Sequence, residues 1–248
     1  MTGQIITASR SALASAAERE KLGQLHPVLR PEPMAMHPDY AKQKADELDA
    51  ELKQAGLLDR DGRPKAGLVD WLIPLCKPSM DYVAYCSVEG KVVTVLSALT
   101  SAMGVVAVAR DDEIYFREIR QDELLDAVFG ELPELLPAQG ELVTLNLAKV
   151  RQERESVMSG VPNRTIKQLR EIDRLPAIQT IDITMHTYDG GHRRRFRNPV
   201  GIKVTDRGDY FSCLIGAGRD EELWTGPATR PNLHKAIDAL RADLVQES

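Results

Sequence analysis

VVAVARDDEIYF, residues 105–116, is the stretch of this chain that decides its fold. Apolar residues lead into a polar turn of Arg, Asp and Asp, and a second strand follows, so the stretch predicts a tight antiparallel hairpin. Residues 201–211, GIKVTDRGDYF, have the same design. Aligning Val108 with Val204 gives an offset of 96 residues (204 − 108). The chain is therefore predicted to contain an internal repeat.

A second pair of turns supports the repeat with a different offset. Glu89-Gly90 and Asp189-Gly190-Gly191 are both typical of hairpin turns, and aligning Gly90 with Gly190 gives an offset of 100 residues (190 − 90). The offsets differ by four residues, which the first half holds and the second half lacks. We place these extra residues in the non-strand stretch Leu99–Gly104.

The remaining elements follow from hydrophobic periodicity. Strands are expected from about Met80 to Phe116 and from about Thr180 to Trp224, with a connector at Leu132–Leu147. Apolar residues that recur every three or four positions predict the helices. These are Ala8–Leu25, a helix with Asp39 as N-cap and Gly56 at C′, Leu68–Leu75, Gln121–Leu132, Val150–Met158, Arg164–Ile172 and a final helix with Pro231 at N1.

Together these elements predict an α+β fold, with a central antiparallel β-sheet, two flanking helical bundles and a pseudo-twofold internal repeat. We expect one domain over residues 1–248, with an N-terminal half at about 39–132 and a C-terminal half at about 150–246. One domain is favoured because each four-stranded sheet alone would leave edges that its twin could cover.

Composition limits the classes of function. The chain of 248 residues is 43% hydrophobic and 28% charged, as in a soluble protein, and its net charge of −5 argues against a dedicated nucleic-acid binder. It contains no apolar run long enough to cross a membrane, and Met1–Arg10 does not resemble a signal peptide, so we expect a cytoplasmic protein. Three cysteines without CxxC spacing predict neither a disulfide framework nor a zinc site.

The sequence contains no motif for catalysis that we would defend. The acidic run Asp111–Glu113 is expected to be a solvated turn, and the five histidines lack metal-binding spacing. His186 is expected on the polar face of a strand, where it alternates with apolar residues. The GxG at Gly216–Gly218 precedes a strand and is expected to be a hairpin loop. We therefore expect no enzymatic activity, no cofactor and no metal.

The strongest charge cluster is the hairpin HRRRFR, residues 192–197. Arginines around Phe196 could bind phosphates while the ring stacks on a base, or they could meet an acidic protein surface. A solvated hairpin arm is the commoner alternative, because edge strands use charge to prevent aggregation. A nucleic-acid or acidic-protein adaptor acting through this hairpin therefore stays open as an alternative function.

Over about residues 41–246 the chain resembles the EspG family, the ESX (type VII) secretion-associated chaperones of actinobacteria. Four segments in this order carry the resemblance: Leu52–Leu57 (LKQAGL), Gly67–Leu72 (GLVDWL), Val105–Arg110 (VVAVAR) and Trp224–Thr229 (WTGPAT). The resemblance implies a cytosolic chaperone that binds the hydrophobic helical tip of the PPE subunit in PE-PPE-type heterodimers. Such a chaperone keeps its cargo soluble and delivers it to one secretion system.

The resemblance also implies where the partner would bind. The surface would include the Leu99–Gly104 loop, the polar strand face and the final helix. The residues expected to contact a partner are Leu99, Thr100, Ser101, Met103, Thr184, His186, Arg195 and Phe196. The cargo pair stays unidentified, and the free protein could also form a homodimer.

Overall fold

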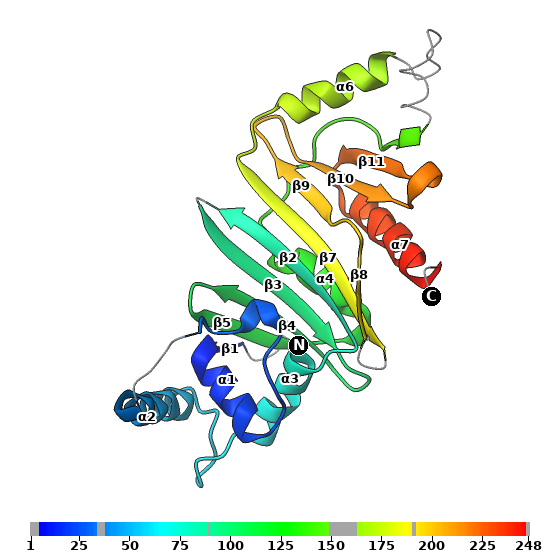
Figure 1. Ribbon diagram of the computed structural model, residues 1–248. Coiled ribbons are helices and arrows are strands. Elements are labelled where there is room, and N and C mark those ends of the chain that lie inside the picture. Colours follow the sequence, from blue (N-terminus) through cyan, green and yellow to red (C-terminus); the bar gives the residue numbers. More distant parts are fainter. Residues whose placement is uncertain (1–4, 34–37, 89, 149–162, 190–191, 247–248) are drawn as a thin grey trace. The chain divides into compact units, whose positions relative to one another are not determined.

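The computed structural model describes residues 5–33, 38–88, 90–148, 163–189 and 192–246 (Figure 1). It is an α+β protein with a large antiparallel sheet, as the sequence predicts. The chain divides into two compact units, and each is described by itself. Unit 1 comprises residues 1–85, 92–132 and 186–193, and unit 2 comprises residues 86–91, 133–185 and 194–248.

The strands of unit 1 follow the order β1-β5-β4-β3-β2 (Figure 1). They are β1 (Ile6–Ser9), β2 (Met80–Val88), β3 (Lys91–Leu99), β4 (Gly104–Arg110) and β5 (Glu113–Ile119). Strands β2 to β5 form the predicted meander. Strand β1 pairs antiparallel with β5, whereas the sequence analysis placed this region at the start of a helix. Four residues, ITAS, are too short to show alternation.

Strands β4 and β5 are the predicted hairpin, and their pairing closes at Arg110 and Glu113. Asp111 takes a φ of 51° in the turn, a left-handed conformation that Asp tolerates better than most side chains. The backbone N–H of Arg10 donates to the carbonyl oxygen of Asp112 at 2.8 Å, which ties the start of helix α1 (Arg10–Arg19) to this turn. The prediction that Asp111–Glu113 is an exposed turn is confirmed.

The helices of unit 1 are α1 (Arg10–Arg19), α2 (Pro38–Gln54), α3 (Ala66–Cys76) and α4 (Leu124–Glu131), with 3-10 turns η1 (Pro27–Leu29) and η2 (Gln121–Glu123). Helix α2 already includes Pro38, so the prediction of Asp39 as N-cap is wrong. Gly56 ends α2 as predicted, with a φ of 69°. The N–H groups of Gly56 and Leu57 donate to Lys53 and Leu52 carbonyls at 3.0 and 2.8 Å, which forms a Schellman cap.

The core of unit 1 lies between α1, α3 and one face of the strands. Alternate residues of β4 and the leucines of α3 share this core: Val105, Ala107, Ala109, Leu68, Leu72 and Leu75. Trp71 of α3 packs edge-to-face on Phe116, with ring centroids 5.9 Å apart. Side chains alternate along a strand, so the remaining buried residues of β4 face the opposite side, where α4 packs.

Unit 2 has the strand order β7-β9-β10-β11-β6, and β8 also pairs with β7 (Figure 1). These are β6 (Val143–Asn146), β7 (Gln179–Asp189), β8 (His192–Arg195), β9 (Val200–Val204), β10 (Tyr210–Ile215) and β11 (Glu222–Pro227). The last four residues of β7 and the first two of β8 belong to unit 1. Strand β6 pairs with β11 and falls within the predicted connector, so that part of the prediction is wrong.

The helices of unit 2 are α6 (Asn163–Arg174) and α7 (Arg230–Gln246), and η3 (Gly218–Asp220) lies in the β10–β11 loop, where a hairpin loop was predicted. The helix expected at Val150–Met158 lies outside the described residues. Thr229 caps α7, because its hydroxyl accepts from the Asn232 N–H at 3.3 Å, and Pro231 is the second helical residue instead of the first. Leu233, Ile237 and Leu240 are buried, as their spacing predicts.

One alignment of the predicted repeat can be compared with the strand order. Aligning Val108 with Val204 matches β4 to β9, but β8 and β9 both pair with β7. They therefore take the place that β3 holds beside β2, and by sheet order β10 is the counterpart of β4. The first alignment is off by one strand because the strand after the second turn is interrupted.

Within the described residues, no helix combines the length and apolar character that crossing a membrane requires.

Candidate functional site

The predicted contact loop is a compact turn between β3 and β4, which pair as far as Leu99 and Gly104. The Thr100 N–H donates to the carbonyl oxygen of Met103 at 2.9 Å, and the Thr100 hydroxyl accepts from the Met103 N–H at 3.3 Å. The hydroxyl of Thr100 is therefore used inside the turn. Met103 is half-buried against the core of unit 1, so Ser101 and Ala102 form the exposed tip.

Serine 79 anchors this loop to the neighbouring strands of unit 1. The N–H and hydroxyl of Ser79 both donate to the carbonyl oxygen of Leu99, at 2.7 and 2.9 Å. The carbonyl oxygen of Ser79 accepts from the N–H of Tyr188, at the end of β7, at 3.0 Å. The loop, the start of β2 and the end of β7 thus form one hydrogen-bonded row.

The other predicted contact residues are not equally accessible. Thr184 is half-buried in unit 2, and Arg195 is exposed. His186 and Phe196 are 4% and 3% exposed, so the prediction that they lie on an open surface is wrong. Phe196 is held in β-like pairing, because its N–H donates to the carbonyl oxygen of Met185 at 3.1 Å.

Burial of Phe196 also weakens the alternative function. A base-stacking platform needs an exposed ring, and this ring is enclosed. Arg193 lies at the start of the hairpin and donates to the Nε2 atom of His186 at 2.8 Å. The arginine hairpin therefore exposes its arginines but not the free aromatic ring that a base-stacking adaptor would use.

Unit 2 has a groove of about 360 Å³ between α6 and strands β9, β10 and β11. Its apolar lining includes Leu169, Ile172, Tyr210 and Leu223. The Nζ atom of Lys203 donates to the carbonyl oxygens of Ile172 and Asp173, at 3.2 and 2.8 Å, which stabilises the end of α6. The sequence predicted a helix at Arg164–Ile172 but gave no indication of this groove.

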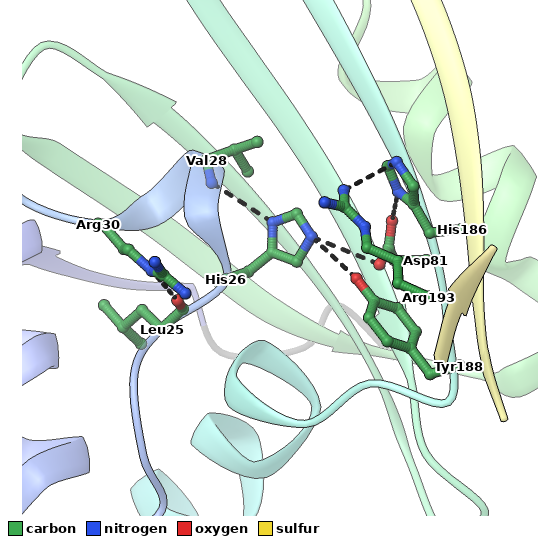
Figure 2. Close-up of polar contacts among 8 residues, drawn as sticks. All are labelled: Leu25, His26, Val28, Arg30, Asp81, His186, Tyr188 and Arg193. Carbon is green, nitrogen blue, oxygen red and sulfur yellow. Dashed lines mark hydrogen bonds and ion pairs between the residues drawn. The ribbon is translucent and has the colours of Figure 1, made fainter. Parts of the chain in front are cut away.

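A buried polar cluster in unit 1 was also missed. We call it the His–Asp–His cluster: His26 before η1, Asp81 in β2 and His186 in β7 (Figure 2). All three are at most 4% exposed. The Nδ1 atom of His186 lies 2.7 Å from Oδ1 of Asp81, and Nε2 of His26 lies 3.4 Å from Oδ2. The second contact is an ion-pair contact and not a hydrogen bond, because Oδ2 of Asp81 has no hydrogen-bond partner among the described residues.

The outer nitrogen of each imidazole faces a hydrogen-bond donor. Arg193 donates to Nε2 of His186 at 2.8 Å, and the Val28 N–H donates to Nδ1 of His26 at 3.4 Å (Figure 2). A nitrogen that accepts a hydrogen bond carries no proton. These donors therefore assign the tautomers, and both imidazole protons point toward Asp81 and its neighbours.

The cluster controls the charge on Asp81. Burial raises the pKa of its carboxyl, but the hydrogen bond from His186 and the contact with His26 outweigh burial and hold that pKa below its usual value. Tyr188 lies close by, with its hydroxyl 3.4 Å from Nε2 of His26. Burial, followed by the Asp81 charge, raises the pKa of Tyr188. Asp81 is therefore a buried carboxylate at neutral pH, with Arg193 one side chain away.

The cluster's donor atoms lie within 4.8 Å of one another, which is close enough for a divalent metal. A metal-binding histidine, however, normally donates its outer N–H to a carbonyl or carboxylate oxygen. Here the outer nitrogens face an amide N–H and a guanidinium instead. The arrangement therefore fits shared protons better than a bound metal.

The thiols of this chain are not activated. Burial raises the pKa of Cys86 to about 11 and that of Cys213 to about 12. Burial also raises the pKa of Cys76 to about 11, although the nearby Lys77 acts in the opposite direction. A nucleophilic cysteine needs the reverse shift, because the thiolate is the reactive form. These three residues are protonated at neutral pH and serve as small packing groups.

Comparison with known proteins identifies one family and one fold. Residues 9–239 match the model of the EspG family, and no curated protein is similar enough to match. Among solved structures, the chain is similar to the Mycobacterium tuberculosis type VII secretion system chaperone EspG5, solved in complex with the PE25-PPE41 dimer. This match has a TM-score of 0.67 and 14% sequence identity, and it covers 96% of this chain and 95% of that chain.

Proposed function

This chain belongs to the EspG family, and we propose that it is a cytosolic chaperone for PE-PPE-type heterodimers. It binds the hydrophobic helical tip of the PPE subunit, keeps the pair soluble and delivers it to an ESX (type VII) secretion system. The observation that supports this most strongly is a shared fold over 96% of the chain with a chaperone solved on its PE-PPE dimer. The protein acts by binding and not by catalysis.

We propose that each unit contributes contacts to the partner by itself, unit 1 through the loop tip and unit 2 through the groove. The loop offers the small exposed residues Ser101 and Ala102, whose backbone a partner helix can approach closely. The groove offers a half-buried apolar lining with charges at its rim, which is the composition of a protein interface. Thr184 and Arg195 extend the proposed surface.

We also propose that the two halves of the chain are a pseudo-twofold repeat within one domain. Residues 86–91 of the first half group with unit 2, and residues 186–193 of the second half group with unit 1. The first residues of these exchanged segments are 100 positions apart (186 − 86), the same offset as between the two glycine turns.

Light scattering on the free protein would test whether it also forms a homodimer.

The proposed function is tested by co-expressing the chain with PE-PPE pairs and measuring complexes by size-exclusion chromatography and calorimetry. We expect one pair to form a stable complex that persists at high salt, because an apolar contact releases few counterions. If no pair binds, the chaperone proposal is wrong for this chain. A complex that dissociates steeply with salt would point to the arginine hairpin instead.

Ala102→Arg tests the loop tip. A long cation in a dry interface is expected to raise the Kd for the cognate pair at least about tenfold, or about 1.4 kcal/mol. The free energy of unfolding should change by less than about 0.5 kcal/mol, because Ala102 is exposed. Met103 is a poorer position for this test, since it packs on the core.

Ala55→Arg is the matched control, because it makes the same change at another exposed position of unit 1. It should leave the Kd unchanged. Calorimetry on both variants decides the question. An unchanged Kd for Ala102→Arg would remove the loop from the proposed surface.

A further inference from the structure

We propose that the His–Asp–His cluster is an acid-sensitive latch that holds β8 against β7 through the contact between Arg193 and His186. The inference concerns the free protein and goes beyond the proposed function. It follows from the positions of the protons on the two imidazoles and from the hydrogen-bond donors that a further proton would face.

Each imidazole in the cluster has one unprotonated nitrogen that can take a further proton. The inner nitrogens face Asp81 and carry the protons already present, so an added proton must enter at an outer nitrogen. A proton on Nδ1 of His26 would break the hydrogen bond from the Val28 N–H, which is long at 3.4 Å. A proton on Nε2 of His186 would break the much shorter hydrogen bond from Arg193, at 2.8 Å.

Protonation of His186 removes the acceptor that Arg193 uses. The imidazolium N–H would then face the guanidinium N–H at close range, with two like charges and no acceptor between them. Asp81 cannot bridge them, because its near oxygen already accepts from the other side of the ring. Arg193 is exposed and can swing into water at little cost. Strand β8 would then lose this side-chain contact with β7.

Among the described residues, several ionisable groups surround the cluster. The ionisable groups that face it are His26, Asp81, Tyr85, His186, Tyr188 and Arg193. The pKa of Asp81 is lowered, and burial raises the pKa values of Tyr85 and Tyr188. Histidine is the side chain whose charge ordinarily changes between about pH 5 and 8. A further proton in the cluster therefore acts on β8 through an imidazole.

The opening caused by a proton on His186 should be confined to β8. The backbone hydrogen bond between Tyr188 and Ser79, at 3.0 Å, contains no titrating group and holds the end of β7 against β2. The part released by Arg193 is therefore β8, which lies beyond this bond along the chain. A pH-dependent change is expected in the amides of residues 192–195 and not in those of the β4–β5 hairpin.

Hydrogen exchange on the free protein tests the latch, with rates corrected for the intrinsic effect of pH. Between about pH 7.5 and about pH 5.5, exchange of the β8 amides is expected to rise about tenfold, the effect of losing one hydrogen bond to a charged group. In Arg193→Met these amides should exchange fast at both pH values. Arg195→Met removes an exposed arginine of the same strand and should behave like the unaltered protein.

Nitrogen NMR of the histidine rings identifies the sensor. We expect Nε2 of His186 to be the unprotonated nitrogen at neutral pH and to gain its proton with the same midpoint as β8 opening. Three results would each overturn the proposal: β8 exchange that does not change with pH, the same pH dependence in Arg193→Met, or opening that follows another histidine.

Discussion

Asp81→Asn is expected to lower the free energy of unfolding by about 3 kcal/mol, because hydrogen bonds to a buried charged group contribute about 1.5–3 kcal/mol each. Asp81 is fully buried, and its carboxylate faces N–H groups of His186 and His26. Asn keeps the volume but removes the charge, and its amide presents hydrogens to groups that are already donors. For a chain of this length the loss corresponds to a fall in Tm of roughly 6–12 °C.

The pH dependence of this loss has a definite sign. The folded pKa of Asp81 lies below its unfolded value, so its contribution to stability is complete above the unfolded pKa of about 3.9 and is lost as pH falls through the folded pKa. The difference in unfolding free energy between the two proteins should therefore be large at neutral pH and should shrink below about pH 4. Denaturant titrations across this range measure it.

Asp112→Asn is the control for the Asp81 variant, because it makes the same change in the exposed β4–β5 turn. Its effect should stay within about 0.5 kcal/mol. Equal losses for the two variants would mean that burial of the Asp81 carboxylate is not what stabilises the fold. A loss for Asp81→Asn that is as large at low pH as at neutral pH would contradict the assigned charge.

Local signals in the sequence were sufficient for much of the fold. The β4–β5 hairpin was predictable because its turn residues and its alternation act over a few neighbouring positions. The end of α2 at Gly56 was predictable for the same reason, since glycine takes a positive φ without strain. Strands β1 and β6 were not, because four residues carry too little periodicity and each depends on its partner strand.

The polar cluster could not be predicted from the same kind of signal. His186 lies 105 positions from Asp81, and only the pairing of distant strands brings them together. Alternation along β7 correctly separated the apolar residues from the face that carries His186. It could not show that this polar face is covered there, because burial of a strand face depends on what packs over it. The Asp81 carboxylate and the Arg193 guanidinium satisfy the two ring nitrogens of His186, the side chain that alternation assigned to solvent.

Gly208→Ala is expected to lower the free energy of unfolding by about 3 kcal/mol, through backbone strain of about 1–2 kcal/mol and overpacking of a similar size. Gly208 has a φ of 102° in the turn between β9 and β10. A Cβ atom there would lie 2.6 Å from the Cα and 2.8 Å from the N atom of Ala138. These are backbone atoms, so no side-chain rotation can relieve the clash.

The close approach of the backbone at Gly208 to that of Ala138 allows hydrogen bonds to form between residues 136–138 and the turn of unit 2. The N–H of Asp209 donates to the carbonyl oxygen of Leu136 at 2.8 Å, and the Leu136 N–H donates to the Asp209 carboxylate at 2.5 Å. The N–H of Ala138 donates to the carbonyl oxygen of Asp209 at 3.1 Å. A side chain at position 208 would therefore push residues 136–138 off the turn and break these bonds together.

Gly218→Ala separates backbone strain from the clash. Gly218 also has a positive φ, 62°, but a Cβ there meets no atom within 4 Å. It should cost about 1 kcal/mol, the strain alone. Denaturant unfolding of both variants gives the difference directly, and Ala138→Gly should rescue Gly208→Ala little, because the nearest atoms remain. Equal losses for the two glycine variants would show that contact with Ala138 does not limit this turn.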